Sequence, residues 1–201
     1  MKPLIPNQGN IKSERIKRYF AEIAKKIILE EGIEQVSIRK IAKLAGYSYA
    51  TIYNHFNAMD ELLWYTRSIM IEDLGAHILL LNNEKIHTVQ GLKNLFRSYM
   101  DYFITNPNIF RFFYFHCLDI TQKKVKSLAE APEFNERIDS TFKFLIESGK
   151  FSAEEVGIII KNLIFSIQGT LTLLTSGNDV MTIETAYKNL DELIDYLIKE
   201  V

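Results

Sequence analysis

The 201-residue sequence has little cysteine, no long apolar run and almost no net charge. Its one cysteine, Cys117, excludes an intrachain disulfide and fits a reducing compartment. No stretch of about eighteen apolar residues is present to span a membrane. The first ten residues lack the apolar core of a secretory signal. We therefore expect a cytoplasmic protein without a membrane partner.

Common enzyme motifs are also absent. The sequence has no Gly-rich phosphate-binding loop and no Gly-x-Ser-x-Gly nucleophile elbow. Glu154 and Glu155 suit the start of a helix, where carboxylates interact favourably with the helix dipole. No metal-ligand spacing relates the four histidines, which are His55, His77, His87 and His116. We expect neither enzymatic activity nor a bound metal or cofactor.

Helical periodicity runs along nearly the whole chain and strand alternation is almost missing, which predicts an all-α fold. With 47% hydrophobic residues, the chain can bury a substantial core. Gly32 is expected to end the first helix, and Asn106-Pro107-Asn108 to break the chain between two later ones. Apart from a short pair in residues 36–56, the expected helices cover approximately residues 13–31, 57–82, 89–105, 109–118, 133–148, 152–176 and 182–201.

The most informative stretch is residues 36–56, which predicts a helix-turn-helix. Ser37 can cap the first helix, and Gly46 supplies the backbone freedom that ends it. Ser48 can cap the second helix, expected over residues 48–56, with Ile52 and Phe56 on its inner side. Its other positions carry hydroxyl groups, an amide and an imidazole, from Tyr49, Thr51, Tyr53, Asn54 and His55. Such groups suit hydrogen bonds to phosphates and base edges.

Charge is divided unevenly along the chain. Residues 1–60 contain ten Lys and Arg against six Asp and Glu, and the remainder contains 14 against 19. A basic segment beside an acidic one is expected when only the first contacts a polyanion such as DNA. Chance in a small domain produces the same imbalance, so the charge gains weight only together with the helix-turn-helix.

These residues resemble the TetR family of bacterial and archaeal transcriptional regulators. The spacing agrees throughout the positions that carry the resemblance, which are Ser37, Ile41-Ala42, Gly46, Ser48, Thr51, Tyr53-Asn54-His55-Phe56 and Asp60-Glu61-Leu62. The resemblance covers only about residues 13–65. It implies a three-helix DNA-binding head over residues 1–57. A larger helical body over residues 58–201 would bind a ligand and dimerise.

The resemblance further implies a homodimeric repressor that binds a palindromic double-stranded DNA operator and is released by a small ligand. Phosphate contacts are then expected from Ser37, Ser48, Tyr53 and His55. Contacts to bases are expected from Arg39, Tyr49, Ala50 and Thr51. Asn54 shares the DNA-facing side, whereas Phe56 is expected to pack inside the head.

Two positions depart from the family pattern. Tyr49 and Ala50 stand where the family commonly has Lys and Gly, so an aromatic ring and a methyl group are expected to read the bases. Met59 stands where the family commonly has a Lys, and one phosphate contact is therefore expected to be missing.

Aromatic and polar residues of the body are candidates for a ligand site. Core packing is the alternative for each aromatic residue. Arg111 suits a ligand carboxylate or a solvated rim, and residues 109–118, Cys117 included, are expected to be buried. The ligand is expected to be mainly hydrophobic, aromatic or acyl. The candidate residues are Tyr99, Phe103, Phe110, Arg111, Phe113, Tyr114, His116, Asn162, Phe165 and Gln168.

The last two helices are expected to form the dimer interface as a four-helix bundle with their copies. One stripe contains Asn162, Ser166, Gly169 and Leu173, and the other contains Ile183, Leu190, Leu193 and Leu197. The alternative is that one or both stripes pack within a single chain.

Two other functions remain open at this point. The first is a DNA-binding architectural or constitutive factor of the same fold that needs no ligand. The second is a ligand carrier whose head no longer binds DNA, for which Met59 is the best argument.

Overall fold

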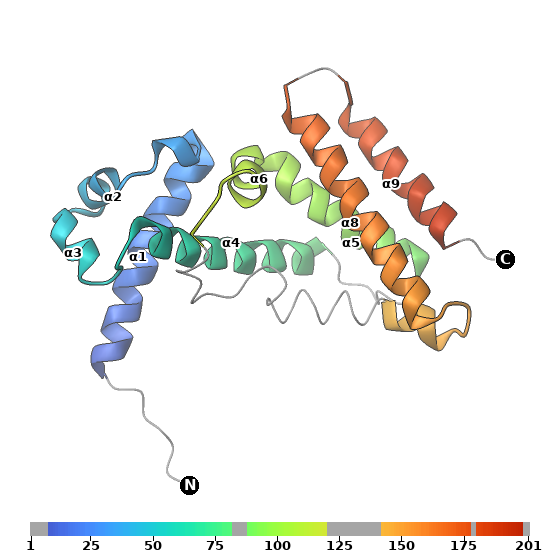
Figure 1. Ribbon diagram of the computed structural model, residues 1–201, viewed down its shortest axis with the longest axis horizontal. Helices are drawn as coiled ribbons and strands as arrows, with labels where there is room; N and C mark the ends of the chain where they lie inside the picture. The colour runs from blue at the N-terminus through green and yellow to red at the C-terminus, as the bar shows by residue number, and fades with distance from the viewer. Residues whose placement is uncertain (1–7, 82–87, 120–141, 178–179, 199–201) are drawn as a thin grey trace, which may run out of the picture. The chain divides into compact units, whose positions relative to one another are not determined.

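The computed structural model describes residues 8–81, 88–119, 142–177 and 180–198, and every regular element among them is helical (Figure 1). The prediction of an all-α fold is confirmed. A 3-10 turn, η1 (Ile33–Gln35), follows the first helix, and residues 142–147 are also helical. The labelled helices are α1 (Gln8–Glu31), α2 (Ile38–Ala45), α3 (Tyr49–Tyr53), α4 (Met59–Leu81), α5 (Val89–Thr105), α6 (Pro107–Tyr114), α8 (Ala153–Thr175) and α9 (Ile183–Leu197).

Short polar side chains fix where several helices begin. The hydroxyl groups of Ser37, Ser48 and Ser152 each accept a hydrogen bond from the backbone N–H three residues later, at 3.2 Å. Glu155 completes a capping box, because its carboxylate accepts from the Ser152 backbone N–H at 2.8 Å. The caps satisfy N–H groups that have no partner inside the helix. The sequence predicted these three helix starts correctly.

Gly46 ends α2 in the left-handed region, with φ 71° and ψ 26°. A residue with a Cβ is strained in this conformation, whereas glycine adopts it freely. The backbone N–H of Tyr47 bonds to the Ala42 carbonyl at 3.0 Å and closes the last turn. The reversal after Gly46 lets α3 begin three residues later.

The second helix of the helix-turn-helix is shorter than the sequence predicted. A helix was expected over residues 48–56, but α3 ends at Tyr53 and Asn54 caps it. The chain then turns, with the backbone N–H groups of His55 and Phe56 bonding to the Ile52 carbonyl at 2.9 Å each. A turn of this kind keeps Ile52 and Phe56 on the same inner side, so their spacing did not distinguish it from a longer helix.

The described chain divides into two compact units. The first contains α1 to α3, α4 as far as Glu72, and residues 108–119 with most of α6. The second contains α4 from Asp73, α5, residues 142–147, α8 and α9. This division differs from the expected boundary between residues 57 and 58, because the first part of α4 and most of α6 pack in the same unit as the head.

The core of the first unit joins the helix-turn-helix to α4. Leu62 of α4 has no exposed surface and lies in the same buried cluster as residues of all three head helices. Burial of this apolar surface is the main force that holds α4 against the head. The cluster comprises Phe20, Ala24, Ile27, Ile41, Ala42, Ala45, Ile52, Phe56 and Leu62.

In the second unit, α8 and α9 each bury one stripe of residues spaced three or four apart. Charged residues join α5 to α9, where Arg97 pairs with Asp191 and Lys93 lies 2.6 Å from Asp195. The buried stripes comprise Val156, Ile159, Leu163, Ile167 and Leu171 on α8, and Ala186, Leu190 and Ile194 on α9.

Residues 109–118 are not buried throughout, contrary to the sequence prediction. The helix α6 ends at Tyr114, and an eight-residue helix presents only one face to the core. Arg111 is exposed, Phe115 is 60% exposed, and Cys117 is exposed as well. The predicted helix over residues 133–148 lies partly outside the described residues, which show its end from residue 142.

Candidate functional site

The turn between α2 and α3 has the geometry of a helix-turn-helix. Ser37 caps α2, Gly46 reverses the chain, and Ser48 caps α3. Ile41 and Ile52 are fully buried and pack the two helices against α1. Since the inner faces are fixed in this way, the outer face of α3 is held in one orientation.

The outer face of α3 carries the side chains expected to contact DNA. Tyr49 is 61% exposed and Tyr53 is 52% exposed. Thr51 is half-buried, and its hydroxyl lies 2.9 Å from the Ser48 hydroxyl. The remaining predicted contact residues that are exposed are Ser37, Arg39, Ser48, Ala50 and Asn54. Large exposed aromatic side chains on a five-residue helix are available to a partner rather than to the core.

His55 differs from the other predicted contacts because it faces α1. Its Nδ1 lies 3.2 Å from the Ser13 hydroxyl, and its ring centroid lies 6.2 Å from that of Phe20. The imidazole is half-buried and contacts α1 from the turn that follows α3. Phe56 is 2% exposed, which confirms that it packs in the head.

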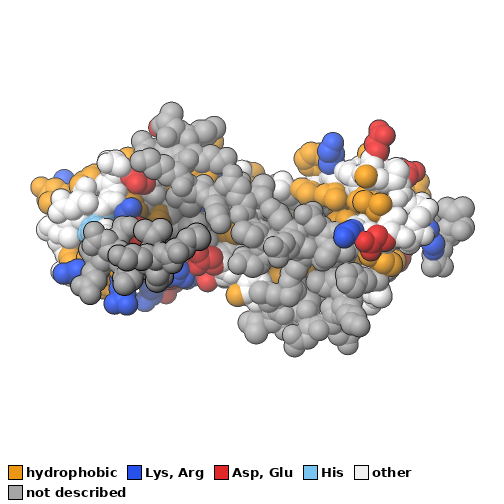
Figure 2. Space-filling view, turned by 90° about the horizontal axis from the view of Figure 1, so that it is seen from below, with side chains coloured by type: hydrophobic (Ala, Val, Ile, Leu, Met, Phe, Trp, Pro, Cys, Tyr) orange, Lys and Arg blue, Asp and Glu red, His pale blue; other side chains and the backbone are white. Residues whose placement is uncertain are grey.

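The head carries exposed basic side chains on α1 and α2. Figure 2 shows blue Lys and Arg side chains gathered at its left end, which belongs to the head. Such a surface attracts a polyanion and supplies affinity that does not depend on base sequence. The exposed basic residues of α1 and α2 are Lys12, Arg15, Arg18, Lys26, Arg39 and Lys43.

Met59 is the first residue of α4 and packs, partly buried, against the head core. A thioether in this place contributes apolar contact and offers no charge to a phosphate. Its position at a helix start agrees with the site at which the TetR-like pattern has a Lys.

Comparison with known sequences shows which family these residues match. The profile of the tetR family of bacterial regulatory proteins matches residues 22–65. The chain belongs to the TetR family. The matched residues include the capped turn and the outer face of α3, so this TetR-family chain has the helix-turn-helix by which the family binds DNA.

Two sequence relatives and one solved structure extend the comparison. The HTH-type transcriptional regulator PksA of Bacillus subtilis is 37% identical over 68 residues, which cover 34% of this chain and 33% of PksA. The nucleoid occlusion factor SlmA of Vibrio cholerae is 22% identical over 92% of this chain and 94% of its own. The crystal structure of RolR with resorcinol has a TM-score of 0.62 at 16% identity, covering 92% of this chain and 89% of RolR. The fold of a TetR-family regulator therefore extends over most of the chain.

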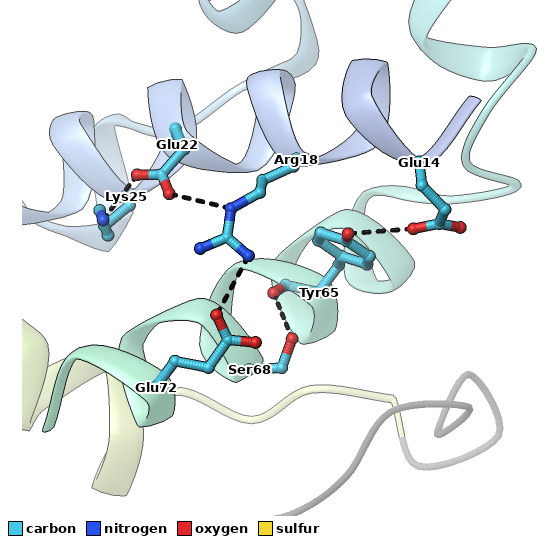
Figure 3. Close-up of polar contacts among 7 residues, drawn as sticks. All are labelled: Glu14, Arg18, Glu22, Lys25, Tyr65, Ser68 and Glu72. Atoms are coloured by element: carbon cyan, nitrogen blue, oxygen red, sulfur yellow. Dashed lines mark hydrogen bonds and ion pairs between the residues drawn. The ribbon is translucent and has the colours of Figure 1, made fainter. Parts of the chain in front are cut away.

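Polar contacts tie α1 of the TetR-family head to α4 (Figure 3). Arg18 donates to Glu72 at 3.1 Å, and this hydrogen bond is the main cause that raises the pKa of Arg18. The Tyr65 hydroxyl donates to Glu14 at 3.0 Å. Burial first, and then this hydrogen bond, raises the pKa of Tyr65 to about 12.

Five of the predicted ligand residues lie in the first unit, on α6 or directly after it. Phe110 and Phe113 are buried, Tyr114 and His116 are half-buried, and Arg111 is exposed. The ring centroid of Tyr114 lies 4.9 Å from that of Phe110 and 6.4 Å from that of Phe113. The structure therefore brings three of these rings together and leaves Arg111 at the surface.

The predicted ligand residues that lie in the second unit are divided between its core and its surface. Tyr99 and Phe103 are buried, with ring centroids 5.0 Å apart, and Gln168 is half-buried. Phe165 is 71% exposed, and Asn162 is exposed and donates its side-chain amide to the Ile158 carbonyl. Neither Phe165 nor Asn162 faces the interior of a single chain.

The helix α8 has a second apolar face that a single chain leaves open. Ile158, Phe165 and Leu173, at helical spacing, are exposed by 53%, 71% and 39%. Figure 2 shows hydrophobic side chains open at its right end, where Figure 1 draws α8 and α9. By length and composition alone, α8 is long and apolar enough to cross a membrane, with a mean hydropathy of 1.5 over 18 residues. One such helix is weak evidence, and this window contains Lys161.

Sequence reasoning missed the contacts between α1 and α4, because their partners lie about fifty residues apart. It also missed Arg67, which lies within the apolar run of α4 and was not distinguished from its neighbours. Within the described part of the chain, no group of three His, Cys, Asp or Glu residues is arranged to hold a metal ion.

Proposed function

We propose that the chain is a cytoplasmic transcriptional repressor that binds a palindromic operator as a homodimer and leaves it when a small hydrophobic ligand binds. The observation that carries this proposal is the outer face of α3, where Tyr49 and Tyr53 are more than half exposed on a helix fixed by the head core. The TetR-family profile covers the same residues.

In this proposal, the two kinds of DNA contact come from different parts of the head. Tyr49, Ala50, Thr51 and Arg39 read base edges in the major groove. Phosphates are contacted by Ser37, Ser48, Tyr53 and His55, the last from its half-buried place beside Ser13, and Asn54 lies on the same DNA-facing side. The exposed basic residues of α1 and α2 support the phosphate contacts, since each neutralised phosphate releases a counterion.

The exposed face of α8 supports the homodimer. Ile158, Phe165 and Leu173 are apolar, lie on one helix face and are exposed in the single chain. Pairing this face with a second copy removes apolar surface from water and fixes the distance between two recognition helices. A palindromic operator matches that two-fold symmetry.

The buried rings near α6 and α5 support a hydrophobic ligand. Phe110, Phe113 and Tyr114 lie together in the first unit, and Tyr99 and Phe103 in the second. RolR, which shares the fold, has been solved with resorcinol, an aromatic ligand. A ligand that binds the DNA-free form more tightly lowers the operator affinity by the same factor.

A DNA-binding factor without a ligand is the second candidate. The observation that favours it is the similarity to the nucleoid occlusion factor SlmA over 92% of this chain. Under this candidate, the aromatic residues of the body are ordinary core, and no small molecule alters the affinity for DNA.

Selection of DNA fragments from a random pool by the purified full-length chain tests the proposal. We expect an enriched palindrome, and footprinting on it should protect two half-sites one helical turn apart or at a multiple of this spacing. Enrichment of single half-sites would contradict the dimer, and no enrichment would contradict sequence-specific binding.

A further inference from the structure

Arg67 on α4 is a half-buried cation without an acidic partner among the described residues. Its Nε is buried and makes no hydrogen bond. Burial lowers the pKa of Arg67 from its ordinary value, yet a guanidinium remains charged in proteins. A buried donor on a charged group is expensive to leave unpaired.

Two aromatic rings flank the guanidinium. Its Cζ lies 5.3 Å from the ring centroid of Trp64 and 4.9 Å from that of Phe113. Trp64 is 7% exposed and Phe113 is 4% exposed, so both rings are held in the core. The Trp64 indole N–H also donates to the Asp119 carbonyl at 3.1 Å. The rings stabilise the charge but accept none of the hydrogen bonds that the guanidinium plane can donate.

Two other arginines of the chain, Arg18 and Arg97, are arranged differently. Arg18 donates to Glu72 at 3.1 Å, and Arg97 pairs with Asp191 while lying over Tyr187. Each of these guanidinium groups therefore has a carboxylate partner. Arg67 has aromatic neighbours, as Arg97 does, but no carboxylate partner among the described residues, so its charge has no counter-ion there.

We infer that Arg67 anchors the carboxylate of an aromatic or acyl ligand. A carboxylate accepts two parallel hydrogen bonds from a guanidinium edge, and pairing at the edge that contains Nε would satisfy the buried donor. The inference rests on the proposed function, because it names the chemistry of the regulating ligand. It also assigns to Arg67 the carboxylate contact that the sequence left open for Arg111 beside a solvated rim position, and Arg111 is exposed.

The surroundings favour a carboxylate with an apolar body. One helical turn on either side of Arg67, α4 carries Leu63 and Met70, which are 3% and 0% exposed. Phe112, whose ring centroid lies 6.0 Å from that of Phe113, is fully buried as well. The apolar surroundings of Arg67 therefore favour a ligand with a hydrocarbon or aromatic body over a strongly hydrated anion such as inorganic phosphate.

Trp64 provides a direct measurement, because it is the only tryptophan in the chain. The full-length protein is titrated with benzoate, 2-naphthoate and decanoate, each beside its neutral amide, and with inorganic phosphate. We expect a saturable change of Trp64 emission with at least one carboxylate, and at least tenfold weaker binding of the matching amide. Silence across all three carboxylates, or equal binding of acid and amide, overturns the inference.

Two variants separate recognition from structure. Arg67→Met keeps an unbranched side chain and removes the charge, so it should abolish the preference for the carboxylate without lowering the melting temperature. Arg67→Lys keeps the charge but loses the planar edge, and should bind the carboxylate more weakly than the wild type. If the Arg67→Met protein has a lower melting temperature and still prefers the carboxylate, the role of Arg67 is structural and the inference is overturned.

Operator binding by the same preparations distinguishes this inference from the proposed function. Selected DNA that binds normally, together with no carboxylate response, rejects only the role of Arg67. A carboxylate response that depends on Arg67, in a protein that selects no DNA, supports the ligand site and rejects the repressor.

Discussion

The guanidinium of Arg18 on α1 donates to the carboxylate of Glu72 on α4 across 3.1 Å. Arg18 also lies 3.7 Å from Glu22 on its own helix. The side chains of Arg18 and Glu72 are 51% and 58% exposed, and exposed pairs of this kind contribute about 0–1 kcal/mol to stability. Leu62 on α4 is fully buried and lies in the core cluster that joins the same two helices. Apolar burial therefore supplies most of the stability of this contact, and the exposed ion pair contributes little.

The first prediction compares these two contributions. A double-mutant cycle with Arg18→Met and Glu72→Gln should give a coupling free energy below about 1 kcal/mol that decreases in high salt. Leu62→Ala should lower the free energy of unfolding by about 2–5 kcal/mol, because it leaves a cavity in the core. Urea denaturation measures all four variants. A larger loss from the ion pair than from Leu62 would mean that α4 is held mainly by charge.

The sequence predicted those elements whose cause is local. Ser37, Gly46 and Ser152 act within one helical turn, and the corresponding helix ends agree with the structure. It predicted poorly what depends on distant partners. The end of α3 is set by a turn after Tyr53, and the exposure of Cys117 by the early end of α6. The exposure of Tyr49 and Tyr53 agrees with the sequence, where aromatic and hydroxyl groups stand in place of the Glu and Lys of an ordinary surface helix, and their contact with DNA stays a prediction.

The second prediction concerns stability at alkaline pH. The pKa of Tyr65 is raised to about 12 by burial and by its hydrogen bond to Glu14, whereas an unfolded tyrosine has a pKa of about 10. Its contribution to stability is therefore fully present below pH 10 and is lost as the pH rises towards 12. Thermal unfolding of the wild type and Tyr65→Phe, measured from pH 8 to 12, should show the smaller decline in the variant. Parallel curves would show that Tyr65 has no such role.

The third prediction concerns base readout by Tyr49, whose side chain is 61% exposed. Tyr49→Ala should weaken binding to the selected operator by about 1–3 kcal/mol per base pair read, with little change on nonspecific DNA. Tyr49→Phe is the matched control, and it isolates the hydroxyl from the ring. Fluorescence anisotropy on both DNA types measures the difference. Equal losses on the two DNAs would make Tyr49 a phosphate contact.

The fourth prediction concerns assembly and uses two positions with opposite burial. Phe165 on α8 is 71% exposed in the single chain, so Phe165→Asp should give folded monomers by disrupting only the contact between copies. Leu190 on α9 is 4% exposed, and Leu190→Asp should unfold the chain because it buries an unpaired charge. Sedimentation and circular dichroism together distinguish the two results. A folded Phe165→Asp dimer would place the interface elsewhere.

The last prediction concerns Met59, which begins α4 where the family pattern has a Lys. Met59→Lys should add one phosphate contact in each protomer, and its methylenes can keep part of the packing against the head core. Each added contact steepens the slope of log affinity against log salt by about 0.9, so a dimer should steepen by up to about 1.8 on operator and nonspecific DNA alike. Met59→Gln is the neutral control and should leave the slope unchanged. If Met59→Lys also leaves it unchanged, the start of α4 lies out of reach of the DNA backbone, and the basic residues of α1 and α2 supply the phosphate contacts without it.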